Sequence, residues 1–130
     1  MKKTQWTVFA ASLVLLAAVP AVAHHSIDAE FDRDKPVELK GTVTKVEWMN
    51  PHIWIYLDVK DASGKVAKWQ VEGGAPNALR RNGISRSALK EGDTVTINGI
   101  MARKGENTAN ARSVTFANGK SAFARDPDSK

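Results

Sequence analysis

Residues 37–71 decide the fold, and they read VELKGTVTKVEWMNPHIWIYLDVKDASGKVAKWQV. Apolar and polar side chains alternate regularly over residues 53–59, which predicts a strand with one buried face. Residues 61–64 (DASG) predict a turn, and apolar side chains resume at every second position over residues 67–71. The stretch therefore predicts a β-hairpin at the centre of an all-β domain.

The segment before this hairpin changes face along its length. Val37, Leu39 and Val43 fall on one parity, whereas Val46 and Trp48 fall on the other. A strand that switches its buried face needs an irregularity, and Gly41 stands near the switch. We therefore expect one long first strand with a bulge or sharp bend between residues 41 and 45.

The chain after the hairpin first changes to a helical pattern and then returns to strands. Residues 76–81 predict a short helix, with Pro76 in its first turn and Gly83 as its stop. Two further strands are expected over residues 95–101 and 114–116. Asn118-Gly119 is a strong hairpin signal, so residues 120–125 are expected to form a return strand.

This order of elements predicts a small OB-like five- to six-stranded Greek-key barrel with one short helix between strands 3 and 4. An immunoglobulin-like sandwich would need about seven strands. We place the barrel domain at residues 37–125 and a disordered tail at residues 126–130. Residues 24–36 are polar and acidic, and we expect them to form an extended arm, not a helix, anchored by Phe31.

The first 23 residues carry the features of an export signal. Lys2 and Lys3 precede an apolar stretch over residues 8–19, which is too short to span a bilayer. Ala21-Val22-Ala23 supplies the small residues that signal peptidase reads, so cleavage is expected after Ala23, with Ala21 as the competing position. We therefore predict a mature protein of 107 residues in the periplasm or secreted, without stable membrane insertion.

Composition narrows the class of function. The chain has no cysteine, which rules out disulfides and thiolate metal sites. Loss of the signal would lower the net charge from +5 to +3, and the basic residues are spread along the chain. Nucleic-acid binding is therefore not expected. Neither a nucleophile elbow nor a glycine-rich phosphate loop is present, so we expect a binding protein, not an enzyme.

The three histidines are the candidate metal ligands. Cleavage after Ala23 would place a free α-amine, the His24 imidazole and the His25 imidazole at the mature terminus. His52 lies at the joint between the first two strands, and the arm is long enough to fold back to it. An amine with two imidazoles suits tetragonal Cu(II), although zinc and nickel also bind such donors.

Other interpretations of these histidines stay open at this point. All three can be solvated, and His52 can be hydrogen-bonded locally. Cleavage after Ala21 would instead put His24 at position three, which also binds copper but in a square plane with backbone amides. If a metal is bound, Asp28, Glu30 or Glu47 is a candidate acceptor that orients a ligand histidine.

Aromatic side chains suggest a second kind of site. Trp54 and Tyr56 lie on the face of their strand opposite Ile53 and Ile55, and an OB barrel binds ligands on such a face. Trp48 and Asn50 lie just before this strand and complete the candidate ligand-binding set. The alternative is that these aromatics pack under the arm or the helix.

Several short motifs resemble one family of small exported bacterial proteins, domain-of-unknown-function family 6152. They are His24-His25-Ser26, Phe31-Asp32, Gly41-Thr42-Val43, Trp48-x-Asn50-Pro51-His52, Asn77-Ala78-Leu79 and Gly92-Asp93. The resemblance covers essentially all of the mature chain. It implies an exported OB-like β domain with His24, His25 and His52 in its signature motifs, and it implies no activity.

These observations leave three functional hypotheses. The first is a copper-binding carrier, sensor or accessory factor that uses its mature terminus and His52. The second is a metal-free OB-type module that binds a small ligand or a partner protein through Trp54 and Tyr56. The third is an accessory subunit of an exported enzyme complex.

Overall fold

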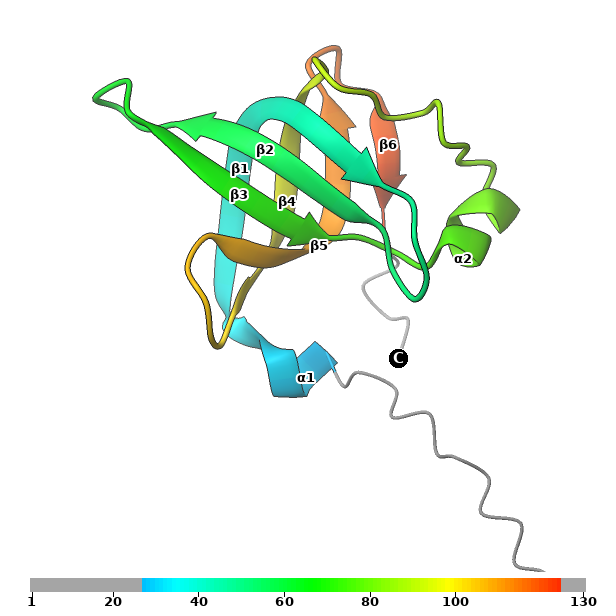
Figure 1. The fold of residues 1–130 in the computed structure, drawn as a ribbon, viewed down its shortest axis with the longest axis horizontal. Helices are drawn as coiled ribbons and strands as arrows, with labels where there is room; N and C mark the ends of the chain where they lie inside the picture. The colour runs from blue at the N-terminus through cyan, green and yellow to red at the C-terminus, as the bar shows by residue number, and fades with distance from the viewer. Residues whose placement is uncertain (1–26, 125–130) are drawn as a thin grey trace, which may run out of the picture.

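A computed structural model describes residues 27–124 of the chain. The predicted signal peptide, its cleavage site, His24, His25 and the predicted tail at residues 126–130 lie outside the described residues. Within residues 27–124 the structure has two short helices and six strands (Figure 1). They are α1 (Ile27–Glu30), β1 (Phe31–Glu47), β2 (Trp54–Lys60), β3 (Val66–Glu72), α2 (Pro76–Arg81), β4 (Thr94–Ala102), β5 (Thr108–Phe116) and β6 (Ser121–Ala124).

The strands form one sheet that closes on itself. Their order is β3-β2-β1-β4-β5-β6, and β3 also pairs with β5 in parallel, which completes a ring of five strands. The other pairings are antiparallel, and β6 adds a sixth strand beside β5. With α2 between β3 and β4, this arrangement confirms the predicted small β-barrel.

The long first strand, β1, pairs with two neighbouring strands, β2 and β4. Its N-terminal part pairs with β4, and its C-terminal part pairs with β2, so the strand curves across the molecule (Figure 1). The register with β2 shifts between Val43 and Lys45, as the change of parity predicted. At Gly41 the two strands approach closely, because a Cβ there would lie 2.4 Å from the carbonyl oxygen of Asp58.

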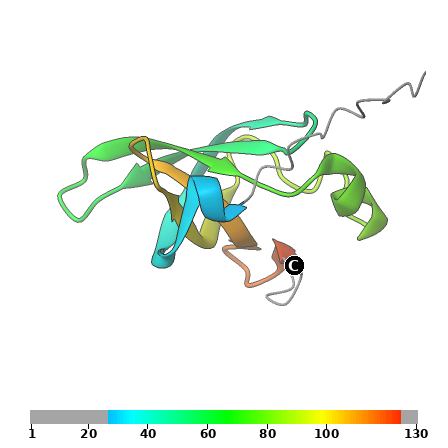
Figure 2. The ribbon, with the colours of Figure 1, turned by 90° about the horizontal axis from the view of Figure 1, so that it is seen from below.

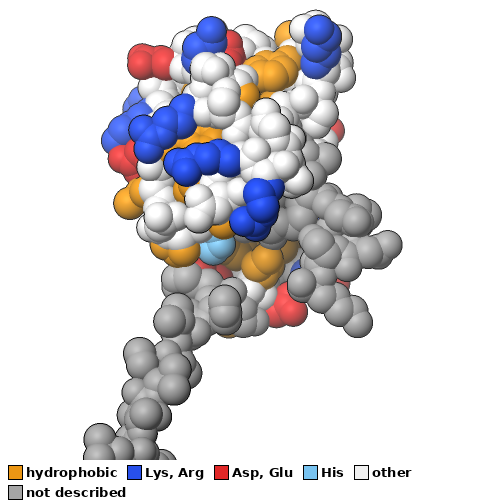
Figure 3. Space-filling view, turned by 90° about the vertical axis from the view of Figure 1, so that its right-hand side faces the viewer, with side chains coloured by type: hydrophobic (Ala, Val, Ile, Leu, Met, Phe, Trp, Pro, Cys, Tyr) orange, Lys and Arg blue, Asp and Glu red, His pale blue; other side chains and the backbone are white. Residues whose placement is uncertain are grey.

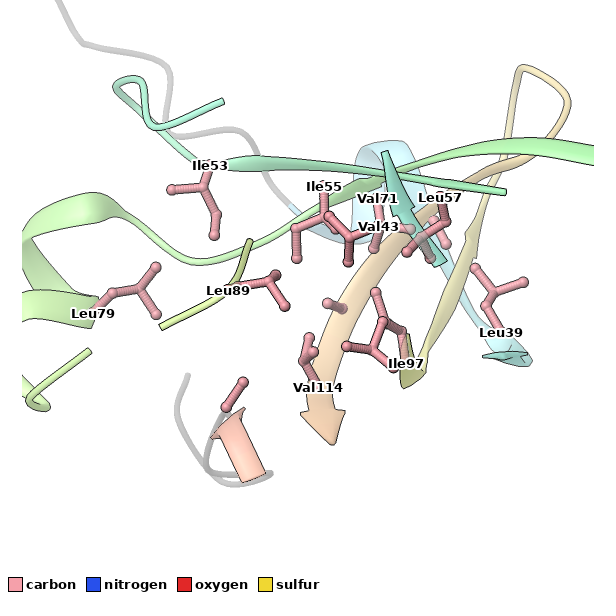
Figure 4. Packing of buried hydrophobic residues seen from close by; sticks show 14 residues of the cluster. Leu39, Val43, Ile53, Ile55, Leu57, Val71, Leu79, Leu89, Ile97 and Val114 are labelled. Carbon is pink, nitrogen blue, oxygen red and sulfur yellow. The ribbon is translucent and has the colours of Figure 1, made fainter. Parts of the chain in front are cut away.

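The core fills the interior of the ring with aliphatic side chains from the predicted inward positions. Figure 4 shows side chains of β1, β2 and β3 pointing toward Ile97 and Val114 on the opposite wall. Burial of each large aliphatic side chain stabilises the fold by about 1.5–3 kcal/mol. The largest completely buried aliphatic residues are Ile53, Ile55, Leu57, Ile97, Ile100, Val43, Val71, Val95 and Val114.

The short helix α2 lies beside the strands, beyond the end of β3 (Figures 1 and 2). Pro76 starts the helix, where its missing N–H leaves no hydrogen bond unmade. Leu79 is 6% exposed and joins the core cluster together with Leu89 from the following segment. The helix and the segment after it therefore extend the core beyond the ring of strands, and α2 stands between the third and fourth strands as predicted.

The segment before the barrel corrects one expectation. We expected an extended arm before Pro36, but Ile27–Glu30 forms a helical turn, and β1 begins directly at Phe31. Arg103 accounts for the turn, because its backbone N–H donates to the Glu30 carbonyl (2.8 Å) and its Nε donates to the Asp28 carbonyl (2.9 Å). Phe31 is the predicted anchor and is 3% exposed.

Candidate functional site

His52 lies in the connection between β1 and β2, directly after the cis peptide bond Asn50–Pro51. Two backbone hydrogen bonds hold this connection against the end of β3. The Ile53 N–H donates to the Gly74 carbonyl (3.0 Å), and the Gly73 N–H donates to the Ile53 carbonyl (2.8 Å). A side chain at Gly73 would prevent this approach, because its Cβ would lie 2.5 Å from Cγ1 of Ile53. The glycine therefore brings His52 beside Glu72.

The side chains of His52 and Glu72 are in contact. His52 Nδ1 lies 3.0 Å from Glu72 Oε1, and the two side chains are 25% and 6% exposed. In a neutral imidazole this contact favours a proton on Nδ1 and leaves the Nε2 lone pair available. Figure 3 shows a small patch of histidine surface in pale blue at the lower part of the described body. The ring is thus fixed on one side and reachable from solvent on the other.

Strand register places further side chains next to Glu72. Trp54 of β2 is its partner across the antiparallel pair, and Asn110 of β5 is its partner across the parallel pair. Directly paired residues share a face of the sheet. Asn110 is 2% exposed, and its Nδ2 has no hydrogen-bond partner within residues 27–124. Trp54, Glu72 and Asn110 therefore form a row across three strands.

The indole of Trp54 borders a hollow of about 330 Å³. The facing wall comes from the junction of α1 and β1, where Ala29, Glu30 and Phe31 line it. Trp54 therefore faces the N-terminal segment across an open space. The other lining residues come from the β4–β5 region and are Ala102, Arg103, Lys104 and Thr108.

Tyr56, two residues further along β2, contacts Glu47 and Lys45 on the barrel surface. Its hydroxyl donates to Glu47 Oε2 (2.9 Å), and Lys45 pairs with the same carboxylate. The Lys45 Nζ atom also lies 5.5 Å from the centre of the Tyr56 ring. These contacts occupy the polar end of Tyr56 and give its side chain a defined position.

The same contacts shift three pKa values. Hydrogen bonds from Lys45 and then from Tyr56 hold the pKa of Glu47 below its usual 4.5. Burial, followed by the hydrogen bond to Glu47, raises the pKa of Tyr56 above 10.0. The hydrogen bond with Glu47 raises the pKa of Lys45.

The remaining two residues of the predicted ligand-binding set lie elsewhere. Trp48 is half-buried and packs against the core cluster, and its buried Nε1 has no partner among the residues that the structure describes. Asn50 is exposed in the β1–β2 connection. Trp48 thus packs against the core, whereas Trp54 lines the hollow.

The carboxylate beside His52 was not among the residues that the sequence indicated. Of the three weighed there, Asp28 pairs with Arg33, and Glu47 pairs with Lys45 and Tyr56. The available signal for Glu72 was its position at the end of an alternating strand, immediately before Gly73-Gly74. A charged residue beside a glycine pair marks a place where another backbone can approach closely.

Over residues 27–124 no group of three or more His, Asp or Glu side chains is arranged to hold a metal ion. None of the helices in that range combines the length and the apolar character needed to cross a bilayer. His24 and His25 precede the described residues, so the structure positions His52 alone of the three candidate metal ligands.

Comparison with known proteins gives one family and one solved structure. The family model described as a family of unknown function, DUF6152, matches residues 11–111. The solved structure is a crystal structure of TiaS in complex with an isoleucine tRNA and ATP, with a TM-score of 0.46 and 23% sequence identity. That match covers 62% of this chain but only 18% of the other. No curated protein matches the chain.

Proposed function

Since this chain belongs to DUF6152, a family of unknown function, its role has to be inferred from the site, and we propose that it binds one transition-metal ion, preferably copper. The ligands in this proposal are His52 and the mature amino terminus that begins at His24. The role that follows is that of an exported carrier or accessory factor that passes the ion to or from an exported partner protein.

The contact between His52 and the buried Glu72 carries the proposal. Ligand histidines in metal sites characteristically direct their second ring nitrogen at a carboxylate, which sets the tautomer and makes the ligand more basic. Here Nδ1 of His52 lies 3.0 Å from Glu72 Oε1, and the Glu72 side chain is buried. Such a contact prepares Nε2 of His52 to donate its lone pair to a metal ion.

The path of the N-terminal segment supports a shared site. Ala29, Glu30 and Phe31 line the same hollow as Trp54, which is two residues from His52 and pairs with Glu72. His24 stands three residues before Ile27, where α1 begins, and three extended residues reach about 10 Å. We infer that a mature terminus at His24 comes within reach of His52.

The donor set favours copper over other ions. An α-amine, the His24 imidazole and the His52 imidazole provide three nitrogen ligands, and His25 is a further imidazole in the sequence. Cu(II) prefers tetragonal nitrogen coordination. A given set of nitrogen donors also has a higher affinity for Cu(II) than for the other divalent ions of the first transition row. Zinc and nickel remain the comparison ions in any test.

The test is a competition titration of the protein as isolated from the producing cells, against a chromogenic chelator of known Cu(II) affinity. A mass spectrum of the same sample establishes whether the chain begins at His24. We expect one Cu(II) per chain, an affinity that exceeds that for Zn(II), and at least tenfold weaker binding in both H24A and H52A.

The matched control is Y56F, which alters a neighbouring side chain on the same strand without removing a metal donor. It should bind Cu(II) as the wild type does, and circular dichroism should show all variants folded. If H24A and H52A bind copper as tightly as the wild type, the shared site is wrong. The metal-free binding module is then the better account.

A further inference from the structure

The hollow beside Trp54 is separate from the proposed metal ligands and has its own chemistry. It lies between α1, the start of β1, β2 and the β4–β5 turn, and it has a volume of about 330 Å³. Pockets that hold small organic molecules start at about this size. Neither the proposed copper site nor the barrel core gives this space a role.

The walls of the hollow are held in place by defined backbone contacts. In the β4–β5 turn, Gly105 and Asn107 adopt positive φ angles of 93° and 51°. The Gln70 N–H donates to the Asn107 carbonyl (3.0 Å), which fastens this turn to β3. On the other side, Arg103 fastens α1 by its bonds to the Asp28 and Glu30 carbonyls. The hollow is therefore preformed, which lowers the entropic cost of binding.

Apolar groups make up much of the lining. Ala29 and Phe31 contribute from the α1–β1 junction, Ala102 from the end of β4, and the half-buried Trp54 from β2. An indole presents a large apolar surface at little conformational cost. A ligand with a flat or aliphatic body is therefore favoured over a small polar one.

Two cations line the hollow, but only one is available to a ligand. Arg103 already has protein partners, because its Nε donates to the Asp28 carbonyl and its Nη1 lies 3.5 Å from Asp32 Oδ2. Lys104 is exposed and forms no ion pair with any of residues 27–124. Glu30 lies on the α1 side of the hollow. Lys104 is therefore the cation that can pair with a negative group of a ligand.

We propose that this hollow binds a small organic carboxylate with an apolar body, its carboxylate on Lys104 and its body against Trp54. The ammonium of Lys104 supplies a charge-assisted hydrogen bond, and the indole supplies the apolar contact. The hydroxyl of Thr108 accepts a hydrogen bond from Gln70 Nε2 (3.0 Å) and donates one to the Glu106 carbonyl (3.1 Å), so its proton is already used.

The experiment uses three probes of one shape, 3-phenylpropionate, 3-phenylpropionamide and 3-phenylpropylamine. Each is titrated into the ¹⁵N-labelled protein in the presence of EDTA and followed by NMR. We expect saturable shifts of the Trp54 indole N–H with the carboxylate, at least tenfold weaker binding of the amide, and still weaker binding of the amine.

Variants separate this site from the copper site. K104Q should weaken carboxylate binding about tenfold, whereas K90Q, an exposed lysine on the α2–β4 connection, should leave it unchanged. H52A should also leave it unchanged, so that failure of the copper proposal does not affect this test. Equal binding of acid and amide, tighter binding of the amine, or no saturable shift at Trp54 would overturn the proposal.

Discussion

Nδ1 of His52 lies 3.0 Å from Oε1 of Glu72, although the two residues stand at opposite ends of the β2–β3 hairpin sequence. The contact forms because the connection before β2 is bonded to the backbone after β3, through Ile53 with Gly73 and Gly74. The carboxylate of Glu72 is buried, whereas the imidazole of His52 is partly exposed to solvent. Such a pairing fixes one nitrogen of the ring and presents the other.

The first prediction concerns this carboxylate. E72Q should weaken Cu(II) binding by about 10- to 100-fold, because loss of the partner of a ligand histidine has effects of that size. The same competition titration measures it. E47Q is the matched control, because Glu47 bonds to Lys45 and Tyr56 instead of to His52. Equal copper affinities for E72Q and E47Q would show that Glu72 does not support a metal ligand.

A second prediction concerns the short distance between the backbones of β4 and β5 at Gly99. A Cβ at Gly99 would lie 2.2 Å from the carbonyl oxygen of Asn110, so G99A must displace backbone. We expect a loss of about 3 kcal/mol in the free energy of unfolding, measured by urea denaturation.

The control for this prediction is G64A in the β2–β3 turn, where no atom lies within 4 Å of the added Cβ. Its only cost is the positive φ of 83°, which is about 1 kcal/mol for a residue other than glycine. If G99A and G64A were equally stable, the β4–β5 pairing would not be as tight as the structure has it.

A third prediction concerns pH. The pKa of Glu47 is lowered, chiefly by the hydrogen bond from Lys45. The stabilisation from these contacts is therefore complete above pH 4.5 and is lost as the pH falls through the lowered pKa. In an NMR titration, the Glu47 carboxyl should have its midpoint below 4.5, and K45M should move the midpoint upward.

The comparison variant is K68M, which removes a lysine that pairs with Asp58 and not with Glu47. It should leave the Glu47 midpoint where it is. A wild-type midpoint at or above 4.5 would contradict the arrangement of Lys45, Glu47 and Tyr56.

The fourth prediction concerns the segment that precedes the barrel. In R103A the carbonyl of Asp28 loses its side-chain donor, and Asp32 loses its ion pair with Arg103. A four-residue helix has little stability of its own, so the amides of residues 28–33 should exchange hydrogen faster. R112A, an exposed arginine on β5, is the control. Unchanged exchange at residues 28–33 in R103A would show that Arg103 does not hold this segment.

The fold could be predicted from the sequence wherever a local pattern determined it. Alternation over residues 53–59 located β2 and its buried face, and the change of parity near Gly41 located the bulge of β1. Pro76 and Gly83 marked the limits of α2 closely. Each of these signals arises from residues that are neighbours in the chain.

The helical turn α1 could not be predicted in the same way. Ile27–Glu30 carries no helical periodicity of its own, and its turn depends on donors from Arg103, far along the chain. The position of Glu72 beside His52 likewise depends on closure of the β1–β2 connection against Gly73. Local patterns carry no information on such long-range contacts, so the sequence indicated His52 but not its carboxylate.

Pulsed electron paramagnetic resonance can establish whether the mature terminus and His52 share one copper ion. In the spectrum of the Cu(II)-loaded protein, each bound imidazole gives a signal from its remote nitrogen, the one that is not bound to copper. These signals give the number of imidazole ligands. We expect two coordinated imidazoles in the wild type and one in H52A. The same count in both proteins, or no imidazole at all, would contradict the shared site.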